Sequence, residues 1–292
     1  MMLQPGHGSP SSESSHAMNT QTPARSVQAP GLFKIMMEAR APLEYTASLA
    51  MAPWLSSAPR VDGHPMLVYP GLMASDFSTR PLRRLLRALG HDARGWGMGR
   101  NLGPRHGLLD QALQRLLHLH RQSGRKVSLV GWSLGGIYAR ELAKLAPDAV
   151  RCVVTLGTPF AGHMHASNAK RTFDWLQRRR GGPRAAMGSA PPAPVTATAV
   201  RREWRDLHVP PPLPTTSIFS RSDGVVAWQS SVQTAGPMSE SIEVRASHTG
   251  LGVNPIALRA LSDRLAQPEG AWLPFKPGPG TRRLYPDPHR HG

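Results

Sequence analysis

Five residues in the middle of the chain, Gly131-Trp132-Ser133-Leu134-Gly135, have the types and spacing that a nucleophilic serine requires. A short apolar run precedes them and a helical pattern follows from Gly136, so they join a predicted strand to a predicted helix. A serine at such a turn projects its hydroxyl above the edge of a sheet, and the flanking glycines avoid a collision between strand and helix. The pattern predicts a nucleophile elbow with Ser133 as the nucleophile.

A nucleophilic serine needs a general base, and the base needs a carboxylate that orients it. Behind an elbow of this kind the acid comes first in the chain and the histidine second. Asp223 follows the predicted strand TTSIFS, and His248 follows a later strand in the segment SHTGLG. We therefore predict His248 as the base and Asp223 as its orienting acid, although Asp223-Gly224 is also a common turn pair. The other downstream histidines are in a predicted insertion, among prolines or in the tail: His163, His165, His208, His289 and His291.

Two backbone amides are predicted to bind the negative oxygen that forms during attack on a carbonyl. Leu134 begins the helix after Ser133, where the N–H groups have no partner and the helix end is positive. Gly71-Leu72 follows an early predicted strand, and the amide of Leu72 is the second expected donor. Arg100 and Asn101 fit the cleft, a helix cap or a role in bracing a loop.

Alternating strand and helix patterns surround these residues. Such alternation predicts an α/β fold with a mostly parallel sheet and helices on both faces. The expected strands are 64–70, 91–96, 127–130, 150–156, 215–220 and 241–244, and the expected helices include 78–89, a stripe of leucines around 109–117, and 254–265.

The segments outside this alternation differ in composition. Residues 1–30 are rich in Ser, Pro and Gly and are expected to be a disordered tail, and residues 269–292 are expected to be a flexible tail. The core comprises 31–160 and 215–268, and the long interruption at 161–214 is expected to form a lid over the site. Within 31–57, Leu43, Ala47, Ala50, Met51 and Trp54 recur at helical spacing, which predicts either a helix packed on the core or a surface helix that touches lipid.

Composition and charge limit the remaining function classes. The formal net charge is +17, with seven arginines and one acid between Arg80 and Arg105 and nine bases and three acids between Lys170 and Asp206. No nucleic-acid motif accompanies this charge, so we expect no nucleic-acid partner, and peripheral contact with an anionic membrane surface stays open. Cys152 is the only cysteine and cannot form an internal disulfide. No signal peptide or run of ~20 apolar residues is apparent, so the expected location is cytoplasmic.

The motifs together resemble the α/β-hydrolase family, in its lipase and esterase branch. The resemblance rests on YPGL at 69–72, GWSLGG at 131–136, TLGTPF at 155–160, SDGVV at 222–226 and SHTGLG at 247–252. It implies an α/β-hydrolase fold with a lid insertion, and hydrolysis of carboxylic esters of apolar acyl chains through an acyl-enzyme. The early turn reads Pro-Gly where many lipases have His-Gly.

Two alternatives remain open at this point. The same three side chains also serve acyl transfer, in which an alcohol or thiol replaces water as the acceptor. They serve thioester hydrolysis equally well, in which a thioester replaces the ester as the substrate. The other alternative is not an enzyme but a non-catalytic protein of the same fold that binds through its basic surface. No metal-ligand cluster or dinucleotide fingerprint is apparent, so neither a metal nor another cofactor is expected; the oligomeric state is not predicted.

Overall fold

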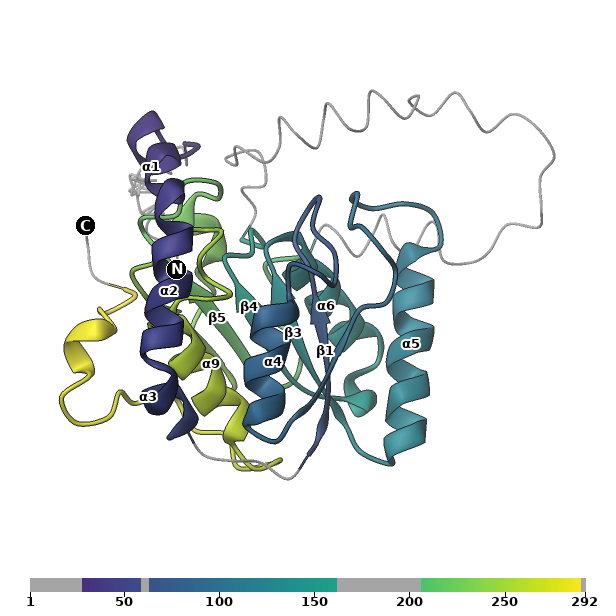
Figure 1. The fold of residues 1–292 in the computed structure, drawn as a ribbon. Helices are drawn as coiled ribbons and strands as arrows, with labels where there is room; N and C mark the ends of the chain where they lie inside the picture. The colour runs from purple at the N-terminus through teal and green to yellow at the C-terminus, as the bar shows by residue number, and fades with distance from the viewer. Residues whose placement is uncertain (1–27, 59–62, 162–205, 290–292) are drawn as a thin grey trace, which may run out of the picture.

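A computed structural model describes residues 28–58, 63–161 and 206–289 of the chain. In these ranges six strands form one parallel sheet in the order β2-β1-β3-β4-β5-β6 (Figure 1). The strands are β1 (Pro65–Tyr69), β2 (Asp92–Gly95), β3 (Val127–Trp132), β4 (Val150–Leu156), β5 (Thr215–Phe219) and β6 (Ser239–Glu243). The predicted α/β class with a parallel sheet is confirmed, and the strand bounds agree with the prediction to within about two residues.

Helices cover both faces of the sheet, as the alternation predicts. On one face α4 (Arg80–Ala88) and α9 (Pro255–Ala266) contribute to one apolar cluster, and on the other α5 (Leu108–Ser123) and α6 (Leu134–Leu145) contribute to a second. Short 3-10 helices are η2 (Pro147–Ala149), η5 (Trp228–Ser231) and η6 (Arg282–Leu284). Because both faces are covered, strands can be apolar on both sides.

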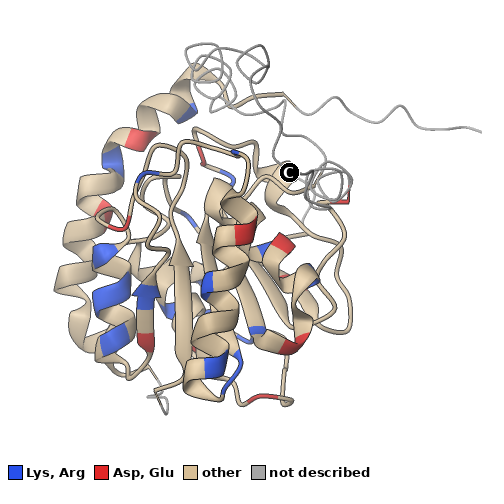
Figure 2. Cartoon of the chain, turned by 90° about the vertical axis from the view of Figure 1, so that its right-hand side faces the viewer, with Lys and Arg blue, Asp and Glu red and all other residues tan. Residues whose placement is uncertain are grey.

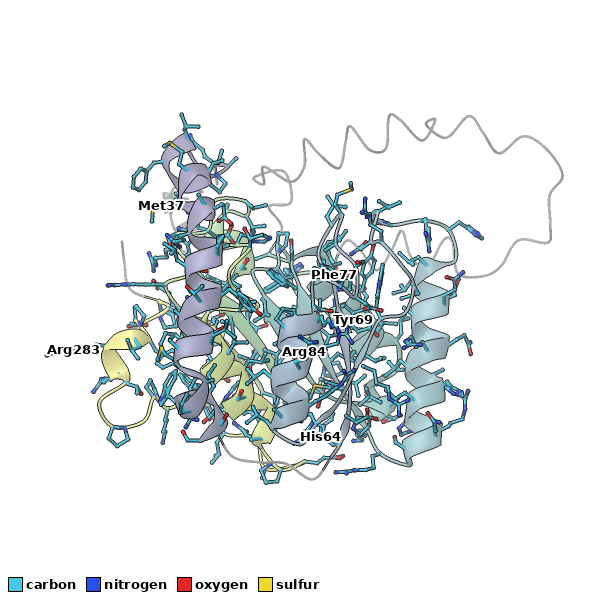
Figure 3. The ribbon with its side chains drawn as sticks, viewed as in Figure 1. Met37, His64, Tyr69, Phe77, Arg84 and Arg283 are labelled. Carbon is cyan, nitrogen blue, oxygen red and sulfur yellow. The ribbon has the colours of Figure 1, made fainter. Side chains whose placement is uncertain are left out.

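Strand β1 shows how the apolar runs divide between the two faces. Met66 and Val68 belong to the cluster under α4 and α9, whereas Leu67 and Tyr69 belong to the cluster under α5 and α6. All five residues of the strand are buried. In Figure 3, His64 lies near the bottom and Tyr69 above it, so the carboxyl edge of the sheet is the upper edge in this view.

The N-terminal segment packs on the core as short helical pieces rather than one helix. These are α1 (Leu32–Met36), η1 (Met37–Arg40), α2 (Ala41–Ala50) and α3 (Ala52–Ser56). The predicted apolar stripe is only partly correct. Leu43 is 70% exposed, and the buried residues of α2 are Glu44 and Ser48. Trp54 and Leu55 of α3 do pack against the core.

Phe160, directly before the predicted insertion 161–214, and Leu207, within it, both contact α6. Phe160 and Leu207 pack on Ile137, and Arg140 stacks its guanidinium 3.9 Å from the centre of the Phe160 ring. Arg140 also donates to the carbonyls of Leu207 and Val209 at 3.2 and 3.1 Å. Burial lowers the pKa of Arg140 to about 10. The body of the predicted lid, 162–205, and the predicted tail at 1–27 lie outside the described residues.

The C-terminal segment, predicted to be a flexible tail, contacts the core as far as Pro288, whose carbonyl accepts a hydrogen bond from Arg221. The rings of Phe275 and Tyr285 meet edge to face with centroids 4.8 Å apart, and Tyr285 donates to the Ile256 carbonyl. The Phe275 amide donates to Glu240 at 2.7 Å. Its aromatic side chains therefore extend the core beside α9.

Charge is distributed widely over the described fold. Figure 2 shows Lys and Arg on several helices, strands and loops rather than on one element. The arginines of α4 include Arg83 and Arg87, which donate to main-chain carbonyls of Asp76 and Ala93. Part of the positive charge thus braces the fold locally. No helix within the described ranges is long and apolar enough to cross a membrane.

Candidate active site

Ser133 lies between the last residue of β3 and the first residue of α6, at the carboxyl edge of the sheet. Its backbone has φ 52° and ψ −124°, a conformation that residues other than glycine rarely adopt. Strain of this kind persists only where the surrounding structure imposes it, and it often marks functional positions. The side chain is 8% exposed. The strand-turn-helix context required by the motif is present.

The surroundings leave no room for side chains beside the elbow. A Cβ added at Gly135 would lie 2.2 Å from the carbonyl oxygen of Tyr69, at the end of β1. The Ser133 amide donates to the Leu156 carbonyl at 2.8 Å, and Thr158 donates its hydroxyl to the Ser133 carbonyl at 2.9 Å. Neighbouring strands β1 and β4 therefore hold the turn in its strained form.

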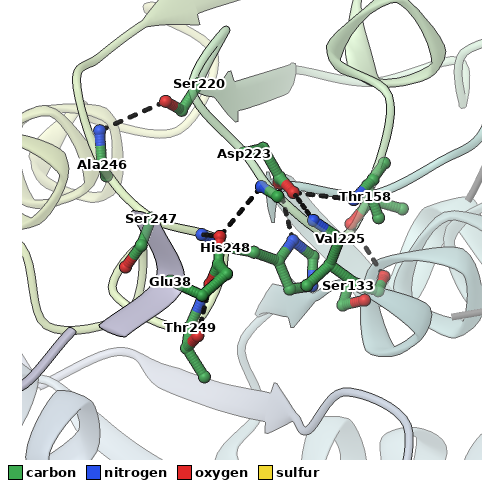
Figure 4. Close-up of polar contacts among 12 residues, drawn as sticks. Glu38, Ser133, Thr158, Ser220, Asp223, Val225, Ala246, Ser247, His248 and Thr249 are labelled. Carbon is green, nitrogen blue, oxygen red and sulfur yellow. Dashed lines mark hydrogen bonds and ion pairs between the residues drawn. The ribbon is translucent and has the colours of Figure 1, made fainter. Parts of the chain in front are cut away.

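Asp223 and His248 come together at the ends of β5 and β6. His248 donates from Nδ1 to Asp223 Oδ2 at 2.7 Å, and both side chains are buried (Figure 4). Asp223 Oδ1 accepts the amides of Val225 and Val226 at 2.8 and 2.7 Å, which fixes the orientation of the carboxylate. In the neutral imidazole Nδ1 carries the proton, so Nε2 is the nitrogen that can accept one. This is the arrangement a general base needs.

The pKa of His248 is raised above its ordinary value. Burial alone would lower it, but the charge of Asp223, the hydrogen bond to Asp223 and the charge of Glu38 outweigh burial. The Trp132 indole donates to the His248 carbonyl at 3.1 Å and so connects the loop that carries His248 to the end of β3. The imidazole is therefore both oriented and able to hold a proton.

The turn after β1 lies beside Ser133, and Asn101 braces it. Asn101 is fully buried and donates its side-chain amide to the Pro70 carbonyl at 2.8 Å. Its own carbonyl accepts the Met73 amide at 2.6 Å. These contacts are those of a residue that braces a loop. Among the hydrogen bonds of the described residues, none is donated by the amide of Leu72.

A cavity of about 490 Å³ opens beside these groups. Ser133, His248 and Leu72 line it together with apolar side chains that include Ile35, Met73 and Trp132. Four of the five predicted site residues thus meet at one place, since Asp223 reaches the cavity through His248. Leu134, the fifth, adjoins Ser133 at the start of α6. Within the described residues no group of three or more His, Cys, Asp or Glu could hold a metal ion.

Sequence reasoning did not find Glu38. This residue of η1 lines the same cavity and accepts hydrogen bonds from Gly224, His248 and Thr249. Nothing in the local sequence MMEARAPLEY distinguishes Glu38 from a solvated helix residue. Only the chain's return to the same place, about two hundred residues later, provides its partners.

The family of the chain follows from comparison with known proteins. A family model described as "Alpha/beta hydrolase family" matches residues 63–276, most of the chain. The chain belongs to the α/β-hydrolase family. Membership confirms the predicted family and agrees with the parallel sheet flanked by helices in this α/β hydrolase. No curated protein matches its sequence.

Solved structures similar to this α/β hydrolase include enzymes with different named activities. Lipase B from Aspergillus fumigatus is 15% identical with a TM-score of 0.49; the match covers 72% of this chain and 54% of the fungal one. A monoacylglycerol lipase from Paleococcus ferrophilus is 15% identical (TM-score 0.43, 64% and 88% covered). The thioesterase domain from the curacin biosynthetic pathway is also 15% identical (TM-score 0.43, 71% and 91% covered). The chain thus spans about half the length of the fungal lipase. These similarities assign no substrate to the chain.

Proposed function

We propose that this α/β hydrolase cleaves carboxylic esters of apolar acyl chains through Ser133, His248 and Asp223. The observation that supports the proposal most strongly is the 2.7 Å contact between His248 Nδ1 and Asp223 Oδ2, in a pair whose histidine lines one cavity with the strained Ser133. A nucleophile, a base and an orienting acid are the three groups that acyl-enzyme chemistry requires.

The first half of the proposed reaction forms the acyl-enzyme. Ser133 Oγ attacks the ester carbonyl carbon while His248 Nε2 takes the hydroxyl proton, and the carbonyl electron pair moves to the oxygen. The amides of Leu72 and Leu134 donate to that oxyanion. The carbon–oxygen bond to the leaving group then breaks, and the leaving alcohol takes the proton from His248.

The second half releases the acid and restores the serine. Water attacks the acyl carbon, gives a proton to His248 Nε2, and the bond to Ser133 Oγ breaks as that oxygen takes the proton back. Asp223 keeps its charge throughout and stabilises the imidazolium that forms in each half. No step consumes or generates an electron carrier.

The cavity supports an apolar acyl group as the part of the substrate that is bound. Its apolar lining comes from the N-terminal helices, the turn after β1 and the end of β3, through residues such as Ile35, Met73 and Trp132. Burying a methylene there is worth about 0.8 kcal/mol. We therefore expect kcat/KM to increase with acyl length until the chain exceeds the cavity.

A series of p-nitrophenyl esters from acetyl to lauroyl tests this function. Wild-type protein should hydrolyse at least the shorter members, and Ser133→Ala should reduce kcat/KM by roughly 10⁴-fold or more. A fluorophosphonate probe should label Ser133 in the wild type and in the control variant Ser57→Ala, which changes an exposed serine. If no acyl ester is turned over and Ser133 stays unlabelled, the proposed function is wrong.

A further inference from the structure

The N-terminal helical segment reaches both loops that carry the proposed acid and base. Glu38, in η1, accepts the amide of Gly224 at 2.9 Å and that of His248 at 2.8 Å, both through Oε1. Its other oxygen accepts the amide of Thr249 at 2.9 Å and the Thr249 hydroxyl at 2.5 Å. Figure 4 shows Glu38 beside His248 and Thr249. One carboxylate therefore connects the loop after β5 to the loop after β6.

A carboxylate suits this position because all four partners are donors. An ionised carboxylate accepts through both oxygens, whereas a side-chain amide would present two N–H groups to one side of the cluster. Burial alone would raise the pKa of Glu38, but the bonds from Thr249, His248 and Gly224 outweigh it and lower the pKa. Glu38 is thus charged at neutral pH, close to the imidazole.

Glu44, a second carboxylate of the N-terminal segment, binds Ser247, the residue before His248 in the loop after β6. Glu44 accepts the amide and the hydroxyl of Ser247 at 2.8 and 2.9 Å. Arg40 links the two loops again, donating to Glu44 at 2.8 Å and to the Ser222 hydroxyl at 2.7 Å. The packing is close: a Cβ added at Gly224 would lie 2.2 Å from the Lys34 carbonyl oxygen.

These contacts differ from those of an ordinary helix anchor. An anchor rests on apolar side chains, as Trp54 and Leu55 of α3 do, yet in α2 the buried residues are Glu44 and Ser48 while Leu43 is exposed. Glu38 instead accepts hydrogen bonds from two backbone amides: that of Gly224, which follows the proposed acid, and that of His248, the proposed base. Charged groups in this cluster include Asp223 from the loop after β5 and Arg40 and Glu44 from the N-terminal segment.

We propose that Glu38 is a positioning residue of the reaction, which fixes the two loops so that Asp223 and His248 keep their contact and adds negative charge beside the imidazolium. The inference rests on the proposed function, in which His248 gains and loses a proton in each half-reaction. Glu38 does not touch the reacting atoms in this role. It acts through the position of the His248 ring and through its pKa.

Two substitutions separate the position of the loops from the charge. Glu38→Gln keeps the length of the side chain and an oxygen for Gly224 and His248, but it removes the charge and sets an N–H group against the Thr249 amide. Glu38→Asp keeps the charge and loses reach. The matched control is Glu269→Gln, because Glu269 is an exposed carboxylate that forms an ion pair with Lys126. Circular dichroism and thermal unfolding establish that each variant is folded.

The first measurement is the pKa of His248 by NMR of its imidazole protons, assigned from the signal lost in His248→Gln. Glu38→Gln should lower this pKa, and Glu38→Asp should lower it less. The wild-type value should persist in Glu269→Gln. This measurement needs no substrate, so it tests the inference even if the ester series fails. An unchanged His248 pKa in folded Glu38→Gln would overturn the proposed charge effect.

The second measurement is steady-state hydrolysis of the best ester in the series. Glu38→Gln should lower kcat about tenfold with KM nearly unchanged, because the lost interaction acts in the transition state rather than in binding. The acid limb of its kcat/KM profile should move to lower pH, in line with the NMR result. Wild-type kcat in both Glu38 variants would show that the segment is only a structural anchor. An inactive wild-type protein would instead contradict the proposed function.

Discussion

His248 and Asp223 are 25 residues apart in the chain, yet the ring nitrogen Nδ1 of one and the carboxylate Oδ2 of the other are 2.7 Å apart. The strands that precede them, β5 and β6, are parallel neighbours in register from Thr215 to Phe219. Because both strands end at the same edge of the sheet, their following loops start side by side. The contact is therefore a consequence of strand pairing completed by the amides that fix Asp223.

Asp223→Asn should lower kcat by roughly 10³- to 10⁴-fold while the protein remains folded. The asparagine oxygen can still accept the amides of Val225 and Val226, which turns its NH₂ group toward His248 Nδ1. That nitrogen must then accept, the ring proton moves to Nε2, and the base has the wrong tautomer. Ester hydrolysis by Asp223→Asn and by the control Asp148→Asn, which changes an exposed residue of η2, measures the effect. A loss smaller than about tenfold would contradict the assignment.

The pH dependence of kcat/KM should show an acid limb above the ordinary histidine pKa of about 6.5. The base must be neutral to take the proton of Ser133, and the charge of Asp223 favours protonated His248. Activity should therefore rise as the pH increases through the raised pKa and fall tenfold per unit below it. In Asp223→Asn the residual acid limb should move to lower pH. A limb that stays in place would mean that another group titrates.

Gly135→Ala should destabilise the protein by about 1–3 kcal/mol or more, because the added methyl group overlaps the end of β1. The new carbon would lie 2.2 Å from the Tyr69 carbonyl oxygen, so either β1 or α6 must move. Gly278→Ala is the control, since its nearest neighbour would be 3.8 Å away. Thermal unfolding of both variants provides the comparison. Equal melting temperatures would show that the elbow tolerates expansion.

Asn101→Ala should lower kcat more than it raises KM. The substitution leaves the Pro70 carbonyl without its buried donor, at a cost of about 1–3 kcal/mol, and frees the turn that presents the Leu72 amide. Arg100→Ala is the matched control, because it changes the exposed residue next to Asn101. Steady-state kinetics and thermal unfolding are measured together. Destabilisation with unchanged kcat would place Asn101 outside the proposed oxyanion site.

The sequence alone determined the features whose cause is local. Apolar runs predicted β1, β3 and β4 because a strand buried on both faces is mostly apolar. The glycines around Ser133 predicted the elbow because its tight turn forbids side chains. Asp223 and His248 could be chosen because each follows a strand, and parallel strands bring their carboxyl ends to one edge.

Only the tertiary structure decided what covers that edge. Helical spacing predicted burial of Leu43, but α2 packs on α9 and on the loop that carries Ser247, so Glu44 and Ser48 are buried instead. Phe275 and Tyr285 are in a stretch of prolines and glycines, and their packing on α9 has no local signal. Glu38 has partners 186 to 211 residues away. Periodicity indicates which residues share a face, whereas the partner surface determines which face is buried.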